Sequence, residues 1–467
     1  MSDDGWWGAE LLACADPRAV WAEVDGPDPS AAVSFETLRV RTARLARTLT
    51  FHGIRPGASV ALHGSPSFTH LWAVFALWSI GAQVILLEPA LGRAEREALL
   101  ELSDPQYVVT LGELRRDEKT FVPECEVLVR PRPNARAPRT DHCLVQFSSG
   151  TTGRPKAAGR TADSLLTEVR RLGRLPLMPR AGERVAVLEP VAHSFALIGG
   201  VLHALAVGAA VVFPAAADRT SVVSAARRCE VLLGRPNHFA QLTGAPAGFR
   251  LPRLRLAVSG GDALPGETAG AFARRYGVLV GQAYGTTETG IVATDLAGTH
   301  GPGSIGVPVP GVRTRVSGGI LQVEIPRSPY PYEASPLHDE GWLSTHDLVA
   351  RDPATGALRL RGRAGRTTSG ADLLDIEAVL RAHRHVTDAV VLGGADPVEA
   401  HVAGTEDLRP AELSDWCRRF LGEHSSPRRF HVVPELARSA SGKVLRDRAR
   451  LHARGWAPPP GPAGRRR

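Results

Sequence analysis

Two lysines mark the places in this sequence where phosphate chemistry is most strongly predicted. The 467 residues contain three lysines and 53 arginines, so nearly every basic position carries arginine. Lys156 ends the run Ser-Ser-Gly-Thr-Thr-Gly-Arg-Pro-Lys, and Lys443 ends the run Ser-Gly-Lys. Lysine is a compact point charge on a flexible stem, whereas arginine is a wide planar fork. We therefore expect each of the two lysines to meet a phosphate or carboxylate oxygen where arginine does not fit.

The run that ends at Lys156 predicts a phosphate-binding loop. It follows the apolar segment 144–147, which is typical of a strand. Glycines let backbone N–H groups approach an anion, and hydroxyl groups donate further hydrogen bonds. The spacing is not that of a GxxxxGK[ST] P-loop, and an ordinary flexible loop is the alternative interpretation. The candidate ligands are Ser148, Ser149, Gly150, Thr151, Thr152, Gly153 and Lys156.

Four further motifs follow in order along the chain. They are Tyr-Gly-Thr-Thr-Glu at 284–288, Gly-Trp-Leu-Ser-Thr-His-Asp-Leu at 341–348, Gly-Arg at 362–363 and Ser-Gly-Lys at 441–443. Together with the run at 148–156, they resemble the motifs of the acyl-adenylate-forming enzymes. This family comprises acyl-CoA synthetases, the adenylation domains of peptide synthetases, and luciferases. The resemblance extends over almost the whole chain.

The resemblance implies that the chain binds ATP and Mg²⁺. The loop at 148–156 would close over the β- and γ-phosphates, Tyr284 would stack on adenine, and Glu288 would hold Mg²⁺. Asp347, helped by Arg363, would accept the ribose hydroxyl groups. The remaining residues implied to bind the nucleotide are Gly260, Gly261, Asp262, Gly285 and Thr286. Ordinary alternatives are a core tyrosine at 284, a solvated acid at 288 and a turn residue at 347.

The implied reaction has two steps. A carboxylate attacks the α-phosphorus of ATP to form acyl-AMP, and the acyl group then passes to CoA or to the phosphopantetheine of a carrier protein. Two anions meet in the first step, so positioned cations are required. The implied catalytic residues are Lys443, Thr287 and His193. Alternatives are activation with a non-thiol acceptor, by amine ligation or diazotisation with nitrite, and a decayed relative that only binds nucleotide.

The acid pocket is predicted to be unusually polar. His193 matches a position that lines this pocket in the family, although a hydrogen-bonded core histidine is the alternative. Arg235, Asn237 and His238 stand where the family usually has a small apolar residue and a helix start, and Gly285 completes the predicted lining. We expect a small polar or aryl acid and not a long fatty acid.

Two departures from the family pattern concern the hinge region, and a third lies in the motif at 341–348. Gly365 replaces the usual hinge acid, and about two residues are missing before Glu377. In thioester-forming relatives this stretch packs along the pantetheine arm, so the second step is less well supported than the first. His346 replaces the usual glycine of a Thr-Gly-Asp motif.

The pattern of elements predicts an α/β fold with two domains. Helical and strand patterns alternate through the first ~300 residues, which is typical of parallel βαβ units, and a small β-rich part follows from about residue 303. We expect a large N-terminal domain at 1–362, a small mobile α+β C-terminal domain at 363–455 and a disordered tail at 456–467. The apolar stretches 71–87 and 195–214 each predict a buried helix followed by a buried strand, and not a membrane span.

The amino-acid composition further narrows the class of protein. Apolar residues make up 43% and charged residues 22%, as in globular proteins. The net charge of +8 comes from scattered arginines, so we expect no nucleic-acid or membrane partner. Five cysteines without a CxxC pair argue against disulfides and a cysteine zinc site, and the acidic N-terminus resembles no secretory signal. We expect a cytoplasmic protein.

Overall fold

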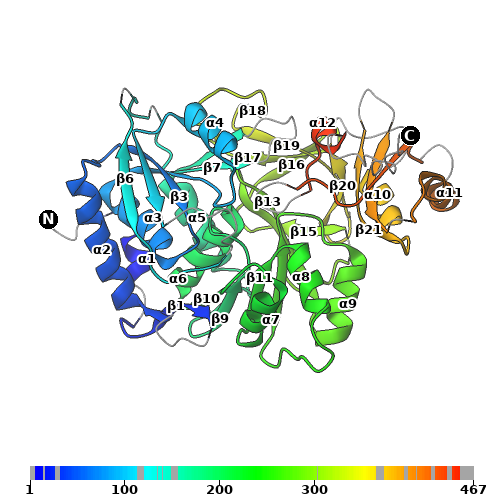
Figure 1. Ribbon diagram of the computed structural model, residues 1–467, viewed down its shortest axis with the longest axis horizontal. Helices are drawn as coiled ribbons and strands as arrows, with labels where there is room; N and C mark the ends of the chain where they lie inside the picture. Colours follow the sequence, from blue (N-terminus) through cyan, green and yellow to red (C-terminus); the bar gives the residue numbers. More distant parts are fainter. Residues whose placement is uncertain are drawn as a thin grey trace, which may run out of the picture. The chain divides into compact units, whose positions relative to one another are not determined.

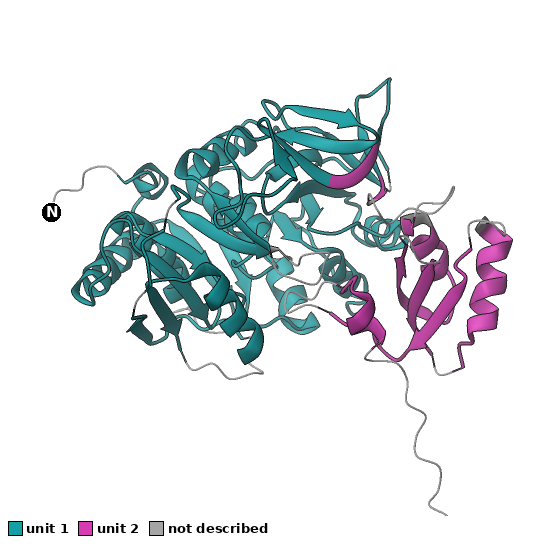
Figure 2. Cartoon of the chain, turned by 90° about the horizontal axis from the view of Figure 1, so that it is seen from above, with its two compact units in different colours: residues 1–148, 155–345, 350–360 teal, residues 149–154, 346–349, 361–467 magenta. Residues whose placement is uncertain are grey.

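The structure is a computed structural model, and contacts divide it into two compact units (Figure 2). Unit 1 comprises residues 1–148, 155–345 and 350–360, and unit 2 comprises residues 149–154, 346–349 and 361–467. Each unit is described by itself. The described residues are 6–13, 16–26, 32–112, 120–133, 135–138, 140–148, 156–301, 303–363, 373–393, 398–405, 407–421, 426–438 and 444–452.

Among the described residues, fourteen strands form one mixed sheet in the order β16-β17-β19-β20-β15-β14-β13-β12-β11-β9-β10-β1-β2, with β18 paired to β19. All neighbouring strands from β1 through β10, β9, β11 and β12 to β13 are parallel. The next three pairs, β13 with β14, β14 with β15 and β15 with β20, are antiparallel. The strands are β1 (Val20–Asp25), β2 (Ala32–Ser34), β9 (Arg184–Val187), β10 (Ala210–Pro214), β11 (Val231–Gly234), β12 (Leu256–Gly260), β13 (Val280–Thr286), β14 (Gly290–Asp295), β15 (Ser304–Pro308), β16 (Thr314–Ser317), β17 (Ile320–Glu324), β18 (His338–Asp339), β19 (Trp342–Arg351) and β20 (Leu358–Arg363).

The parallel strands are apolar because both of their faces are buried. Val231 and Leu233 face a core shared with η2 and α6, whereas Leu232 faces a core shared with α7, α8 and α9 (Figure 1). Strands and helices alternate here, so the α/β prediction is confirmed. The helices are α5 (Ala162–Leu172), η2 (Phe195–Leu202), α6 (His203–Val207), α7 (Arg219–Arg227), α8 (Pro236–Thr243) and α9 (Gly266–Tyr276).

A second sheet has the order β6-β5-β3-β4-β7-β8. Its strands are β3 (Ser59–Gly64), β4 (Gln83–Leu86), β5 (Tyr107–Leu111), β6 (Val127–Pro131), β7 (Leu144–Ser148) and β8 (Lys156–Arg160). The helices near it in sequence are α1 (Ala9–Ala13), α2 (Phe35–Phe51), α3 (Phe68–Ile80) and α4 (Arg93–Ser103). Ser34 caps α2 by accepting the backbone N–H of Thr37 at 3.1 Å.

The stretch 195–214 contains an irregular helix where a regular one was expected. Residues 195–202 form a π-helix, α6 continues it, and the predicted buried strand follows as β10. The π-helix packs closely on β9, because a Cβ atom at Gly200 would lie 2.8 Å from Val187 Cγ2. Short π-helical segments are frequent beside functional sites.

Unit 2 contains a three-stranded sheet in the order β21-β22-β23. One face packs on α10 and α11, and the other face contributes to a small core with Leu451 of α12. The elements are α10 (Leu373–Arg381), β21 (Val386–Leu392), β22 (Glu399–Gly404), α11 (Pro410–Leu421), β23 (Arg429–Val433) and α12 (Arg448–His452). Within the described part of the chain, no helix is long and apolar enough to cross a bilayer.

Candidate active site

A β-hairpin holds both ends of the predicted phosphate loop. β7 and β8 are antiparallel, and Ser148 pairs with Lys156 as the last and first residues of the two strands. The loop therefore starts and ends at one point of the sheet edge. Residues 149–155 lie outside the described part, and with them the predicted ligands Ser149, Gly150, Thr151, Thr152 and Gly153. The side chain of Ser148 also lies outside it.

The second motif, Tyr-Gly-Thr-Thr-Glu, ends β13 and begins the turn to β14. The strand register shifts between Tyr284 and Gly285, and such a bulge changes the direction of neighbouring side chains. Gly285 has a packing reason, because a Cβ atom there would lie 2.1 Å from the carbonyl oxygen of Gly290. The Thr286 backbone N–H donates to Thr289 Oγ1 at 3.0 Å. This bond stabilises the turn that presents Thr287 and Glu288.

A residue that no sequence motif predicted, Glu168, joins these two hairpins. Glu168 lies on α5, and its Oε2 atom is 2.7 Å from Arg160 Nη2. Its Oε1 atom accepts the backbone N–H of Ile291 at 2.8 Å. Arg160 ends β8 and Ile291 lies in β14, so one buried carboxylate connects the strand of Lys156 with the hairpin of Glu288. A signal was available, because helical spacing places Glu168 on the buried face of α5.

The environment of Glu288 contains the half-buried phenol of Tyr330. Burial and the nearby Glu288 carboxylate raise the pKa of Tyr330 to about 12. Tyr330 therefore stays neutral at pH 7 and does not compete with Glu288 for a cation. A carboxylate oxygen at this turn is a suitable ligand for Mg²⁺, which prefers oxygen.

The glycines at the end of β12 allow close approach of other residues. Gly261 has a φ of +78°, a left-handed conformation that favours glycine. A Cβ atom there would lie 3.4 Å from Arg235 Nε, and one at Gly260 would lie 3.0 Å from the Phe195 ring. Asp262 is exposed, and its Oδ1 accepts the backbone N–H of Ala263 at 2.9 Å.

Two acid–base pairs and His238 form what we call the polar cluster, made of Glu88, Glu189, His193, Arg235 and His238. His193 Nε2 lies 2.7 Å from Glu88 Oε1, and Arg235 Nε lies 2.7 Å from Glu189 Oε1. Burial opposes ionisation of Glu88, but His193 and Arg235 together hold the pKa of its carboxyl below the usual value. The two pairs therefore interact with each other.

Of the three residues predicted from the segment 235–238, two are buried and one is exposed. His238 Nδ1 accepts the backbone N–H of Arg235 at 3.0 Å, which caps α8, and burial lowers the pKa of His238 to about 3. The side chain of Asn237 is exposed on α8 and does not join the polar cluster. Neither Glu88 nor Glu189 was predicted, although each directly precedes a proline after a buried strand.

Asp347 lies in β19 and Arg363 ends β20, the neighbouring strand. The side chain of Arg363 lies outside the described part. His346, beside Asp347, has a φ of +60°. Glycine adopts this left-handed conformation without strain. The backbone at His346 therefore has the conformation that suits the glycine usual at this position in the family.

Lys443 lies in the segment 439–443, outside the described residues. Its flanking residues are held within unit 2: Arg438 and Val444 form an antiparallel bridge. Arg446 contacts both carboxylate oxygens of the buried Glu377, at 2.5 Å and 2.8 Å. The ends of the lysine segment are therefore anchored to the unit's own core.

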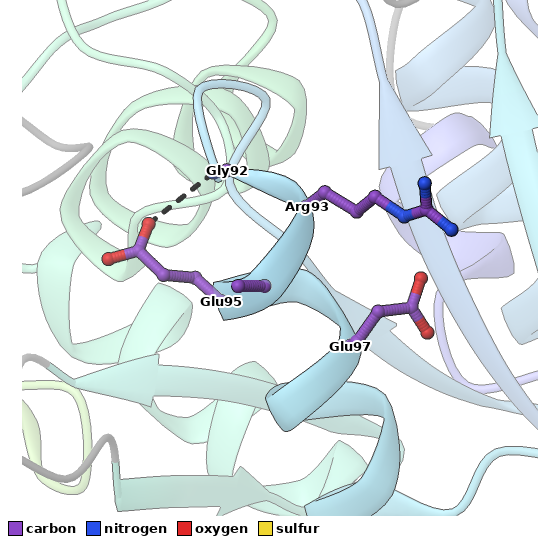
Figure 3. Close-up of a pocket in the computed structure, with 5 residues that line it drawn as sticks. Gly92, Arg93, Glu95 and Glu97 are labelled. Carbon is purple, nitrogen blue, oxygen red and sulfur yellow. Dashed lines mark hydrogen bonds between the residues drawn. The ribbon is translucent and has the colours of Figure 1, made fainter.

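A shallow surface hollow at the start of α4 involves none of the predicted site residues. It is lined by exposed parts of Gly92, Arg93, Ala94, Glu95 and Glu97 (Figure 3). Glu95 Oε2 accepts the Gly92 backbone N–H at 3.4 Å, so this feature is explained by the capping of the helix.

Similar curated proteins are ligases that act on carboxylic acids. A sulfoacetate–CoA ligase of Cupriavidus necator is 29% identical, with 91% of this chain and 94% of that protein covered. A feruloyl-CoA synthase of Amycolatopsis is 28% identical, with 90% and 94% covered. A p-hydroxybenzoic acid–AMP ligase of Mycobacterium tuberculosis is 28% identical, with 94% and 68% covered.

Solved structures support the same fold. An ATP-bound MatB of Rhodopseudomonas palustris has a TM-score of 0.80 at 22% identity, covering 96% of this chain and 99% of that one. An o-succinylbenzoate CoA synthetase of Bacillus subtilis, in complex with its acyl-adenylate, has a TM-score of 0.80 at 22% identity, covering 98% and 100%.

Family profiles match both parts of the sequence. The profile described as AMP-binding enzyme matches residues 13–320, and the profile of the AMP-binding enzyme C-terminal domain matches residues 375–443. The first match alone covers more than half of the chain. The chain therefore belongs to the AMP-binding enzyme family, and the resemblance to acyl-adenylate-forming enzymes is confirmed.

Proposed function

We propose that this chain is an AMP-forming acid–thiol ligase that activates a small polar or aryl carboxylic acid with ATP and Mg²⁺. The acid becomes acyl-AMP with release of pyrophosphate, and the acyl group then passes to the thiol of CoA or of a phosphopantetheinylated carrier protein. The observation that carries this proposal is the Glu168 bridge, because it ties the strand of Lys156 to the turn of Thr287 and Glu288. Family membership and the ligase relatives support the enzyme class.

The residues present suit ATP and Mg²⁺. The phosphate loop, closed by the β7–β8 hairpin, would bind the β- and γ-phosphates, with Lys156 supplying charge at its end. Tyr284 would contact adenine from the bulge in β13, and Thr287 would bond the α-phosphate. Glu288 would hold Mg²⁺. Asp347 and Arg363 would hold the ribose. These assignments are carried over from the family motifs and are proposals for this chain.

Lys443 completes the proposed chemistry of the first step. The carboxylate and the α-phosphate are both anionic, and negative charge grows on the phosphoryl oxygens as pyrophosphate leaves. A compact ammonium group can lie between the two anions without blocking the attacking oxygen. We therefore assign Lys443 to orient the acid and to stabilise charge in the transition state.

The polar cluster supports the proposed class of acid. His193, Arg235 and His238 offer donors and acceptors in a region where a fatty-acid site would need apolar side chains. Buried polar groups reject an apolar ligand because it would leave them unpaired. Hydroxylated or amino-substituted benzoic acids and short polar acids satisfy such groups, whereas medium-chain fatty acids do not.

The test has two stages. Acid-dependent exchange of labelled pyrophosphate into ATP, measured across a broad acid panel, should give the highest kcat/KM with polar or hydroxylated aryl acids. A clear preference for medium-chain fatty acids would contradict the acid class. Absence of exchange with every acid would favour a protein that only binds nucleotide.

The second stage identifies the acceptor. The best acid is incubated with ATP and either CoA or a phosphopantetheinylated carrier protein, and thioester is measured by mass spectrometry. Thioester formation supports the proposal. Acyl-AMP that accumulates with both thiols, and that reacts only with an amine or nitrite, would instead favour a non-thiol acceptor. This stage matters because the hinge region that includes Gly365 departs from the thioester-forming pattern.

A further inference from the structure

Three histidines and one glutamate converge on one face of the unit 2 sheet. Glu399 and His401 are two residues apart on β22, so their side chains lie on the same face. His431 of β23 is directly opposite His401 in the parallel register. His452 ends α12, whose Leu451 packs against the same face. All four side chains come from unit 2.

The nitrogen and oxygen atoms of this group are close together. His401 Nε2 lies 3.2 Å and His452 Nε2 lies 3.3 Å from Glu399 Oε1, and His431 Nε2 lies 3.9 Å from Glu399 Oε2. One ligand atom from each residue lies within 4.8 Å of every other. The His401 and His431 rings are stacked, with centroids 4.6 Å apart and planes inclined by 17°.

Hydrogen bonding within the protein explains only part of this arrangement. Glu399 is 2% exposed, and its Oε1 accepts from Arg448 Nε at 2.7 Å, which stabilises a buried carboxylate. His431 Nε2 is buried, however, and has no hydrogen-bond partner among the described residues. His401 Nδ1 is also buried without a hydrogen-bond partner among the described residues. Rotation of this ring would let either of its nitrogens bind an ion. Buried ring nitrogens without partners are costly, and a bound ion would satisfy them.

We propose that Glu399, His401, His431 and His452 bind one divalent transition-metal ion, with Zn²⁺ as the preferred ion. The ligands would be one nitrogen of each histidine and one carboxylate oxygen of Glu399, while Arg448 Nε keeps its contact with that carboxylate. All four proposed ligands belong to unit 2, and the proposal does not depend on the proposed function.

The geometry requires only small side-chain movements. In a tetrahedral zinc site with Zn–N bonds of about 2.0–2.1 Å, ligand atoms are about 3.3 Å apart. Two of the separations in the cluster already have this length, and the longest must contract by roughly 1.5 Å, which side-chain torsions can supply. Three of the four ligands lie on the neighbouring strands β22 and β23, so the ion would mainly draw His452 inward.

The ligand set selects the class of metal. Imidazole nitrogen suits zinc, copper and nickel, whereas magnesium and calcium prefer sites made of oxygen. A surface pocket lined by His401, His431 and His452 provides a path for the ion.

The site would attach α12 to the sheet. α12 begins five residues after Lys443 and has five residues, which is too short for a stable isolated helix. A bound ion that links His452 to β22 and β23 would restrict the backbone that follows Lys443. We therefore expect the ion to raise the thermal stability of unit 2.

The test uses untagged full-length protein freed of metal with a chelator. Titration with Zn²⁺ in a calorimeter should show one high-affinity equivalent, and Co²⁺ should give the intense visible bands of a tetrahedral site. H431Q and H452Q should each weaken Zn²⁺ binding by at least tenfold, since even neighbours of metal ligands change affinity by about 10–100-fold. H52Q, at the exposed C-cap of α2, is the matched control and should bind as the parent does.

Binding weaker than millimolar, or binding that H431Q and H452Q both leave unchanged, would overturn the proposal. Circular dichroism of each metal-free variant establishes that it is folded. His452 is 43% exposed at the end of its helix, so H452Q keeps the test decisive if substitution of the half-buried His431 prevents folding. A rise in melting temperature with Zn²⁺ in the parent, and its loss in H452Q, would separately support the proposed clamp.

Discussion

Glu168 and Arg160 form a buried ion pair at 2.7 Å, between a helix and the strand that begins with Lys156. The same glutamate accepts the backbone N–H of Ile291. Neither residue belongs to a family motif. Their contact nevertheless determines how two motifs in unit 1 are held relative to each other, because both side chains are almost completely buried.

Substituting this glutamate should therefore damage both stability and catalysis. E168Q keeps an acceptor for Ile291 but leaves the Arg160 guanidinium as an uncompensated buried charge, which costs about 3–5 kcal/mol. Urea unfolding measures this loss, and pyrophosphate exchange at low temperature should fall as well. The matched control is E124Q, which breaks the exposed pair with Arg41 and should cost less than about 1 kcal/mol. Equal effects of the two substitutions would contradict the bridging role.

The lysine scarcity leads to a sharp test of Lys443. K443R keeps the positive charge but replaces a point charge with a wide fork, and K443A removes the charge. Each should lower pyrophosphate exchange by at least about 100-fold, as removal of other preorganised charges does, while ATP still binds. K119R, at the remaining lysine outside any motif, should retain parental exchange. Normal exchange by K443R would show that size does not matter at this position.

The polar cluster should control which acid is used. In the double variant E189M/R235M the buried pair is replaced by apolar side chains of similar length, which avoids leaving one charge unpaired. We expect the ratio of kcat/KM values for apolar over hydroxylated benzoic acids to rise about tenfold or more. N237A, on the exposed side of α8, should leave this ratio unchanged. The same acid ranking in the parent and double variant would exclude the cluster from acid recognition.

His346 should be a strained residue. Its φ of +60° costs a residue with a Cβ atom about 1–2 kcal/mol, whereas glycine adopts this conformation freely. H346G should therefore stabilise the protein by up to about 1 kcal/mol, after subtraction of the greater freedom of glycine in the unfolded chain. Thermal unfolding measures the effect. G277A, at a positive φ of +72° with open space around it, is the reverse control and should destabilise the protein. Loss of stability in H346G would show that contacts of the imidazole outweigh the strain.

His203 should make the protein sensitive to mild acid. Burial lowers the pKa of His203 from its ordinary 6.5 to about 4, so protonation favours the unfolded chain. The free energy of unfolding should therefore decrease as the pH falls from 6.5 towards 4. One such histidine accounts for about 2 kcal/mol between pH 6.5 and pH 5.

H203L removes this group, so it should lose less stability than the parent on acidification, as measured by urea unfolding at pH 7.5 and pH 5.0. The exposed variant H52Q is the control. Parallel pH profiles of H203L and the parent would contradict the assignment.

The local sequence was sufficient to predict much of the fold and to identify the motifs. The apolar runs at 231–234 and 256–260 are strands because parallel strands are buried on both faces, and Ser34 starts a helix because its hydroxyl caps it. Such features depend on neighbours in the chain, so composition and spacing were sufficient. The two motif lysines and the resemblance to the family could be recognised for the same reason, because each motif consists of residues that are neighbours in the chain.

Tertiary structure decided which polar residues work together. Glu168 meets Arg160 and Ile291 across 8 and 123 residues, and Glu399 meets His452 across 53, because packing of strands and helices brings these positions together. No local pattern encodes such contacts. The same holds for Arg235, which sequence places on a pocket wall but which the fold pairs with Glu189. Burial makes each of these charges require a partner, and only the folded chain determines which partner is within reach.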